Sequence, residues 1–141
     1  MRDVSIEIKK IKKRYGTLDP YRLAREMDII IHRLPLGETR GIYYYSHRIK
    51  SVILHQDLPD WMERFVLAHE IGHMIMHPKH NAPFMQNTFF SKDRYETEAN
   101  MFALHMLIPD EDLAEYPDRT IGDWAAIIGM PIWLVELRTK Y

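Results

Sequence analysis

The chain has 141 residues and a mass of 16.9 kDa, and 46% of its residues are hydrophobic against 28% that are charged. These values predict one domain over residues 1–141 and exclude a second domain of ordinary size. The 19 basic and 20 acidic residues give a net charge of -1, which excludes the broad positive field of many proteins that bind nucleic acids or anionic membranes.

The sequence contains no cysteine but eight histidines, a large number for its length. Disulfides and thiolate metal sites are therefore excluded, and a metal site would have to use histidine, carboxylate or carbonyl ligands. The first ten residues lack the apolar core of a signal peptide, and no window approaches the roughly 18 apolar residues of a membrane span. We expect a cytoplasmic protein with no membrane partner.

The first third of the sequence predicts two helices followed by a small sheet. Residues 4–15 carry isoleucines at helical spacing among basic residues and end before Gly16. Asp19 followed by Pro20 is typical of a helix start, and this second helix reaches Met27. β-branched and aromatic residues predict three strands, of which the last two form a hairpin: residues 29–31, 41–45 and 49–54.

The rest of the sequence is predicted to be mainly helical. Apolar residues recur at helical spacing from Trp61 to Ile75, and Pro78 ends the helix. Residues 79–91 show no clear period and predict a loop. The remaining expected features are a second long helix over residues 92–107 with Ser91 as its N-cap, an acidic turn at 110–112, and short helices over 121–128 and 132–139.

The motif that indicates chemistry lies in the first long helix, where His69, Glu70 and His73 form an HExxH sequence. Residues i and i+4 share one face of a helix, so both imidazoles can point at a single ion. Glu70 lies beside that ion and can accept a proton from a water molecule that the ion activates. Because a chain of this composition contains HExxH by chance in roughly 3% of cases, a third ligand is needed.

Glu96 on the second long helix is the candidate third ligand. It would complete a His2Glu site with an open fourth position, which is typical of a catalytic zinc ion. Asn100 lies one turn further and can orient a ligand histidine through a hydrogen bond. Glu98 is the alternative ligand, but it points about 200° away from Glu96 around the helix. The pairing with Asn100 favours Glu96 over Glu98.

His77 extends the row of histidines by one more helical turn. It lies about 12 Å along the helix axis from His69, which is too far for both to bind one ion. We therefore expect His77 to cap the helix C-terminus, where the helix dipole favours a partly positive imidazole.

Two sequence stretches together resemble the ImmA/IrrE family of metallo-endopeptidases: HExGHxxxH over residues 69–77, and ExEANxFA from Glu96, followed by Leu-Ile-Pro. The resemblance spans residues 42–109. It implies an α+β fold with a gluzincin-like core, in which a small mixed sheet of about three strands packs on the HExxH helix and a glutamate-bearing helix, with extra N- and C-terminal helices. It also implies one zinc ion held by His69, His73 and Glu96, with Glu70 as general base.

Members of that family on phages and mobile elements act as antirepressors that cleave a helix-turn-helix repressor. The resemblance therefore implies a zinc endopeptidase with a helix-turn-helix repressor as its protein substrate. We expect the substrate strand to lie beside the tyrosine-rich hairpin, with at least one of its three consecutive tyrosines facing outward. The group that stabilises the oxyanion stays open among four residues: His80, Arg94, Tyr95 and His105.

Two other functions stay open from the sequence. A non-catalytic binding module could sequester the repressor, with a structural or vestigial metal site. DNA binding could use the basic residues 9–14 and the two C-terminal helices, but Gly129 and Pro131 more simply mark a turn between packed helices. We therefore expect no direct binding to nucleic acid. The sequence leaves the oligomeric state unknown.

Overall fold

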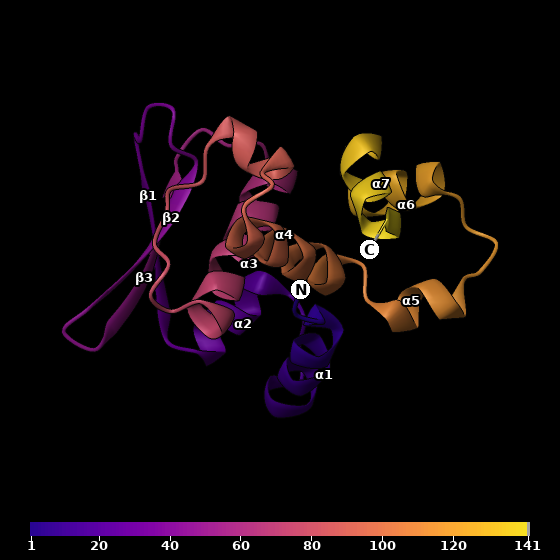
Figure 1. The fold of residues 1–141 in the computed structure, drawn as a ribbon, viewed down its shortest axis with the longest axis horizontal. Coiled ribbons are helices and arrows are strands. Elements are labelled where there is room, and N and C mark those ends of the chain that lie inside the picture. The colour runs from indigo at the N-terminus through magenta and orange to yellow at the C-terminus, as the bar shows by residue number, and fades with distance from the viewer. Residues whose placement is uncertain (141) are drawn as a thin grey trace.

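The computed structural model describes residues 1–140 (Figure 1). Within that range the elements follow in this order: α1 (Val4–Tyr15), α2 (Pro20–Glu26), β1 (Ile29–Leu34), β2 (Gly41–Ser46), β3 (Ile49–His55), α3 (Asp60–Met76), the 3-10 helix η1 (Gln86–Phe90), α4 (Arg94–Leu107), α5 (Asp110–Glu115), α6 (Ile121–Ile128) and α7 (Ile132–Lys140). The α+β fold predicted from the sequence is confirmed. None of the helices in this part of the chain is long and apolar enough to cross a bilayer.

The first two helices begin where the sequence predicts, and an aspartate side chain caps each of them. The Asp3 side chain accepts a hydrogen bond from the Ser5 amide at the start of α1, and Gly16 ends α1 in the left-handed region with φ 73°. The Asp19 side chain accepts from the Arg22 amide just before Pro20 opens α2. Helix α1 buries one face, made of Val4, Ile8 and Ile11.

The three strands form one mixed sheet in the order β1-β3-β2. Strands β2 and β3 form the predicted antiparallel hairpin, while β1 runs parallel to β3. The hairpin turn uses His47 and Arg48, both with positive φ, which is typical of a two-residue type I′ turn. Tyr43 is buried, whereas Tyr44 and Tyr45 are exposed. The expectation that at least one tyrosine faces outward is confirmed.

Helix α3 is the centre of the fold, with the sheet on one side and α4 on the other (Figure 1). Because both sides are covered, every residue from Phe65 to His73 is buried. The two helices approach closely at Gly72, where an added Cβ would lie 2.8 Å from Cδ1 of Phe102. Only a glycine fits this position without moving α4.

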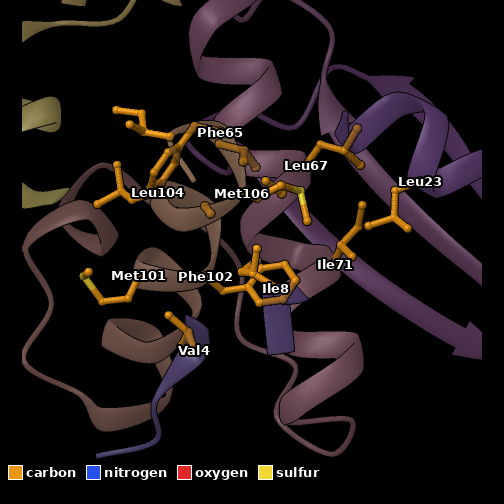
Figure 2. Packing of buried hydrophobic residues seen from close by; sticks show 14 of the residues in the cluster. Val4, Ile8, Leu23, Phe65, Leu67, Ile71, Met101, Phe102, Leu104 and Met106 are labelled. Atoms are coloured by element: carbon orange, nitrogen blue, oxygen red, sulfur yellow. The ribbon is translucent and has the colours of Figure 1, made fainter. Parts of the chain in front are cut away.

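The main hydrophobic cluster joins the N-terminal helices to this helix pair. In Figure 2, Ile8 of α1 lies beside Phe102 of α4, and Leu23 of α2 lies near Ile71 of α3. At the other end of the molecule, α6 and α7 pack on each other, and α7 contacts α4 (Figure 1). The core therefore holds α3 and α4 in place from two directions.

Two local expectations were wrong. Helix α4 begins at Arg94 and its N-cap is Asp93, not Ser91, because the charged Asp93 carboxylate accepts from two amides at the positive end of the helix. The residues expected to form an acidic turn instead open α5, since acidic groups in a first turn favour a helix. Within the predicted loop, residues 86–90 form η1, and α7 extends one residue beyond the predicted end.

A polar cluster ties α3 to the preceding elements. Arg33 of β1 donates two hydrogen bonds to Glu63 of α3, at 2.8 and 3.0 Å, and the Tyr21 hydroxyl of α2 donates a third at 2.8 Å. The hydrogen bonds from Arg33 lower the pKa of Glu63 against the opposing effect of burial, and Tyr21 adds to the lowering. The charged carboxylate thus joins three elements.

Gly72→Ala should lower the free energy of unfolding by about 1–3 kcal/mol, because its Cβ forces α3 and α4 apart. Gly122→Ala is the matched control, since the nearest atom to an added Cβ there is 3.7 Å away. This control should change stability by no more than about 1 kcal/mol, towards greater stability. Urea unfolding of both variants measures the difference, and equal effects would contradict the close approach at Gly72.

Glu63→Gln should lower the free energy of unfolding by about 0.5–1 kcal/mol at neutral pH, a small effect because Arg33 is half exposed. A lowered pKa stabilises the fold fully above the ordinary carboxyl value of 4.5, and this stabilisation is lost as the pH falls through the folded value. The difference between wild type and variant should therefore shrink in acid. Urea unfolding at neutral pH and at about pH 3 tests this, and a constant difference would contradict it.

Candidate metal centre

Three polar side chains meet in the buried space between α3 and α4. His69 and His73 lie one turn apart on α3, and Glu96 lies in the first turn of α4. Nε2 of His69 is 3.0 Å from Nε2 of His73 and 3.4 Å from Oε1 of Glu96, which His73 Nε2 also contacts. The three ligand atoms lie within 4.8 Å of one another, and all three residues are buried. This group could hold a metal ion.

The electrostatics of the cluster favour a charged carboxylate. Burial alone would raise the pKa of Glu96, but the His69 and His73 imidazoles beside it outweigh burial and lower this pKa to about 2. Burial lowers the pKa of His73, against the opposing hydrogen bond to Glu96. A carboxylate and neutral imidazoles are the protonation states in which these side chains bind metals.

Glu70 follows His69 on α3 and has a fully buried side chain. Among the described residues, neither of its carboxylate oxygens has a hydrogen-bond partner. Burial raises the pKa of Glu70 well above its ordinary value, and the negative charge of Glu96 raises it further, against a smaller lowering by the Tyr43 backbone amide. A buried carboxyl group without partners is costly, so this arrangement suits a site that takes up a cation and water.

Asn100 holds the His69 ring in the way predicted from the sequence. The Oδ1 atom of Asn100 lies 2.8 Å from Nδ1 of His69, while its Nδ2 atom donates to the Thr88 carbonyl at 2.8 Å. Because the amide nitrogen is engaged with Thr88, the amide oxygen faces His69 and accepts its Nδ1 hydrogen. Nε2 of His69 is then left with a lone pair towards the cluster.

The alternative ligand, Glu98, lies outside the cluster. Its Oε1 atom is 2.8 Å from Nε2 of His77, and its Oε2 atom accepts from the Arg2 backbone amide at 3.0 Å. His77 is the C-cap residue of α3, as expected. The expectation that its imidazole is partly positive was wrong, because α4 covers this face and burial lowers the pKa of His77 against the effect of Glu98.

His80, one of the four residues that could stabilise an oxyanion, lies close to the cluster. Its Nε2 atom is 3.7 Å from Oε1 of Glu96. This nitrogen is buried and has no hydrogen-bond partner among residues 1–140. The Tyr95 ring packs on the His80 ring with centroids 5.1 Å apart. Position and a free nitrogen therefore favour His80.

The other two candidates face different groups. Nε of Arg94 lies 3.4 Å from Oε2 of Glu98. Nδ1 of His105 lies 3.7 Å from Oδ1 of Asp110, at the start of α5. These contacts therefore direct Arg94 and His105 towards other carboxylates and not towards the three ligand atoms.

Sequence reasoning missed two residues that enclose the cluster. The fully buried Phe84 packs its ring edge-on to His69 at a centroid distance of 4.7 Å, and its backbone pairs with Gly41 at the start of β2. The Tyr43 ring stacks on the His73 ring with centroids 6.4 Å apart, and its hydroxyl donates to the Pro78 carbonyl at 2.6 Å. Phe84 is one of several apolar residues in the loop over residues 79–91, with Met85, Phe89 and Phe90, and no periodicity in the sequence singles it out.

Comparisons with known proteins agree with this geometry. A model of a peptidase family, described as "IrrE N-terminal-like domain", matches residues 24–139. "Uncharacterized immunity region protein 2" of Bacillus phage phi105 is 36% identical over 139 residues, which cover 96% of this chain and 88% of that protein. "Metallopeptidase ImmA" of Bacillus subtilis (strain 168) is 26% identical over 110 residues, which cover 77% of this chain and 65% of that protein. The chain therefore belongs to the ImmA/IrrE family.

Proposed function

We propose that this protein is a zinc-dependent endopeptidase in which His69, His73 and Glu96 hold one zinc ion and Glu70 is the general base. The observation that carries the proposal is the buried cluster of two imidazole nitrogens and a carboxylate oxygen beside a buried carboxyl group that has no partner in the described chain. The peptidase family and the relative named as a metallopeptidase support it.

The donor set fits zinc, which prefers nitrogen and oxygen ligands in tetrahedral geometry. A zinc ion held by His69, His73 and Glu96 would keep a position open for water or substrate and would supply a Lewis acid for the scissile carbonyl. Glu70 lies next to His69 on α3, so its free carboxylate oxygens can accept a proton from the attacking water. The same carboxyl group then delivers that proton to the leaving amine nitrogen.

The edge of the sheet supports an extended substrate. Strand β2 lies at one edge, and the exposed Tyr44 and Tyr45 belong to it. Among the described residues, Phe84 pairs with this edge only at Gly41. A peptide can therefore add to the rest of β2 as a further strand, which presents its backbone in the extended form that hydrolysis requires.

We infer that the substrate is a helix-turn-helix repressor of a phage or mobile element and that the protein acts as an antirepressor. The relative named as an immunity region protein supports this, because it comes from a phage and aligns with 96% of this chain. In this proposal one peptidase domain over residues 1–141 acts in the cytoplasm on the repressor and has no direct contact with DNA.

Co-expression with the helix-turn-helix repressor encoded nearest to this protein should yield discrete repressor fragments. Glu70→Gln should abolish these fragments, because the variant keeps the metal ligands but loses the base. Glu63→Gln is the matched control on the same helix and should leave the fragments unchanged. Intact-mass spectrometry of the repressor gives the result. An intact repressor with wild type and Glu70→Gln, while repression is still relieved, would instead establish a non-catalytic binding module.

Zinc should raise the free energy of unfolding of the purified metal-free chain. The expected gain is about 2.7 kcal/mol at a free zinc concentration 100 times the dissociation constant, because only the folded chain assembles the cluster. His73→Ala should remove most of this gain, whereas Glu63→Gln should keep it. Urea unfolding with and without zinc measures the effect, and an equal gain in the His73→Ala variant would contradict the assigned ligands.

A further inference from the structure

A line of hydrogen bonds leads away from the cluster on the far side of the His73 ring. Nδ1 of His73 lies 3.1 Å from Nδ1 of His77, and Nε2 of His77 lies 2.8 Å from Oε1 of Glu98. All three side chains are buried. Glu98 belongs to α4, so the line connects the second half of the HExxH motif to the helix that carries Glu96.

The chemistry of the three groups decides where the hydrogens lie. A carboxylate can only accept, so the hydrogen between His77 and Glu98 is carried by Nε2 of His77. A neutral imidazole has one ring hydrogen, so Nδ1 of His77 is bare and accepts from Nδ1 of His73. With a metal ion bound between His73, His69 and Glu96, Nε2 of His73 would then be the nitrogen that offers its lone pair to the ion.

The surroundings of Glu98 keep it in the accepting form. Its second oxygen accepts from the Arg2 backbone amide at 3.0 Å and faces Nε of Arg94 at 3.4 Å. The Arg2 guanidinium also reaches the Met76 carbonyl at 3.4 Å, next to the end of α3. Donors therefore surround this carboxylate on the side away from His77, as a buried charge requires.

We propose that His77 and Glu98 are positioning residues that fix which nitrogen of His73 carries the hydrogen, and so present Nε2 of His73 to the metal. The inference rests on the proposed metal site. Asn100 does the same for His69 through a single amide. The two histidines of the motif are thus oriented by different groups, an amide for the first and a histidine–carboxylate pair for the second.

The first test is zinc affinity, measured on the purified full chain by competition with a chromophoric chelator. Glu98→Gln should weaken zinc binding about 10- to 100-fold, because an amide can turn its NH2 group to His77 and reverse the hydrogen order. His77→Leu should weaken binding to a similar degree, since leucine cannot accept from His73. Glu63→Gln, the matched control on α3, should bind zinc as the wild type does.

His77→Gln is the rescue variant. Its amide oxygen can accept from His73 while its amide nitrogen donates to Glu98, so it preserves the hydrogen order and should keep most of the affinity that His77→Leu loses. Circular dichroism checks that each variant is folded. Three outcomes would each overturn the proposal. The first is wild-type zinc affinity in both Glu98→Gln and His77→Leu, and the second is an equal loss of affinity in His77→Gln and His77→Leu. The third is a loss of the same size in the control, Glu63→Gln.

The second test reads the hydrogens directly by nitrogen NMR of the histidine rings in the zinc-loaded protein, in which Nε2 of His73 carries no hydrogen. His77 should carry its hydrogen on Nε2 in the wild type, and Glu98→Gln should shift part of the population to Nδ1. A wild-type His77 that carries its hydrogen on Nδ1 overturns the proposal. Because this measurement uses no substrate, its result does not depend on whether the proposed peptidase activity is found.

Discussion

The close approach of α3 and α4 at Gly72 is the constraint on which the metal centre depends. With no side chain at Gly72, the Phe102 ring lies directly against the α3 backbone. The histidines come from one helix, and Glu96 and its supporting residues come from the other. A wider separation would pull the imidazole nitrogens from the carboxylates and leave several ionisable groups buried without partners, which is far more costly than the lost apolar contact.

Most of the fold could be predicted because its signals are local. Asp3, Asp19 and Gly16 fix helix ends through contacts within a few residues, and alternating or helical apolar patterns identify the strands and the long helices. The start of α4 was misplaced because Ser91 and Asp93 are both acceptable caps, and only the structure shows which side chain reaches the free amides. The parallel pairing of β1 with β3 depends on tertiary packing, which no local pattern records.

In the candidate site too, the local features could be predicted from the sequence and the contacts between distant residues could not. The two histidines of the HExxH motif lie one helical turn apart, and Glu96 is preferred to Glu98 because Asn100 lies one turn after it. Helical geometry alone could therefore indicate the cluster. The C-cap position of His77 was predicted, but the charge of its imidazole was misjudged, because its side chain is buried against Glu98 on another helix, 21 residues away. Phe84 was missed because a loop has no periodicity from which burial can be read.

The division of the site between two helices also has a consequence during protein synthesis. A ribosome releases α3 before α4, so a growing chain carries the complete HExxH sequence well before Glu96, Glu98 and Asn100 can pack against it. Until then the two histidines have neither the carboxylate ligand nor the groups that orient their rings. A chain truncated before α4 would therefore keep the sequence by which such proteins are recognised and yet have no assembled centre.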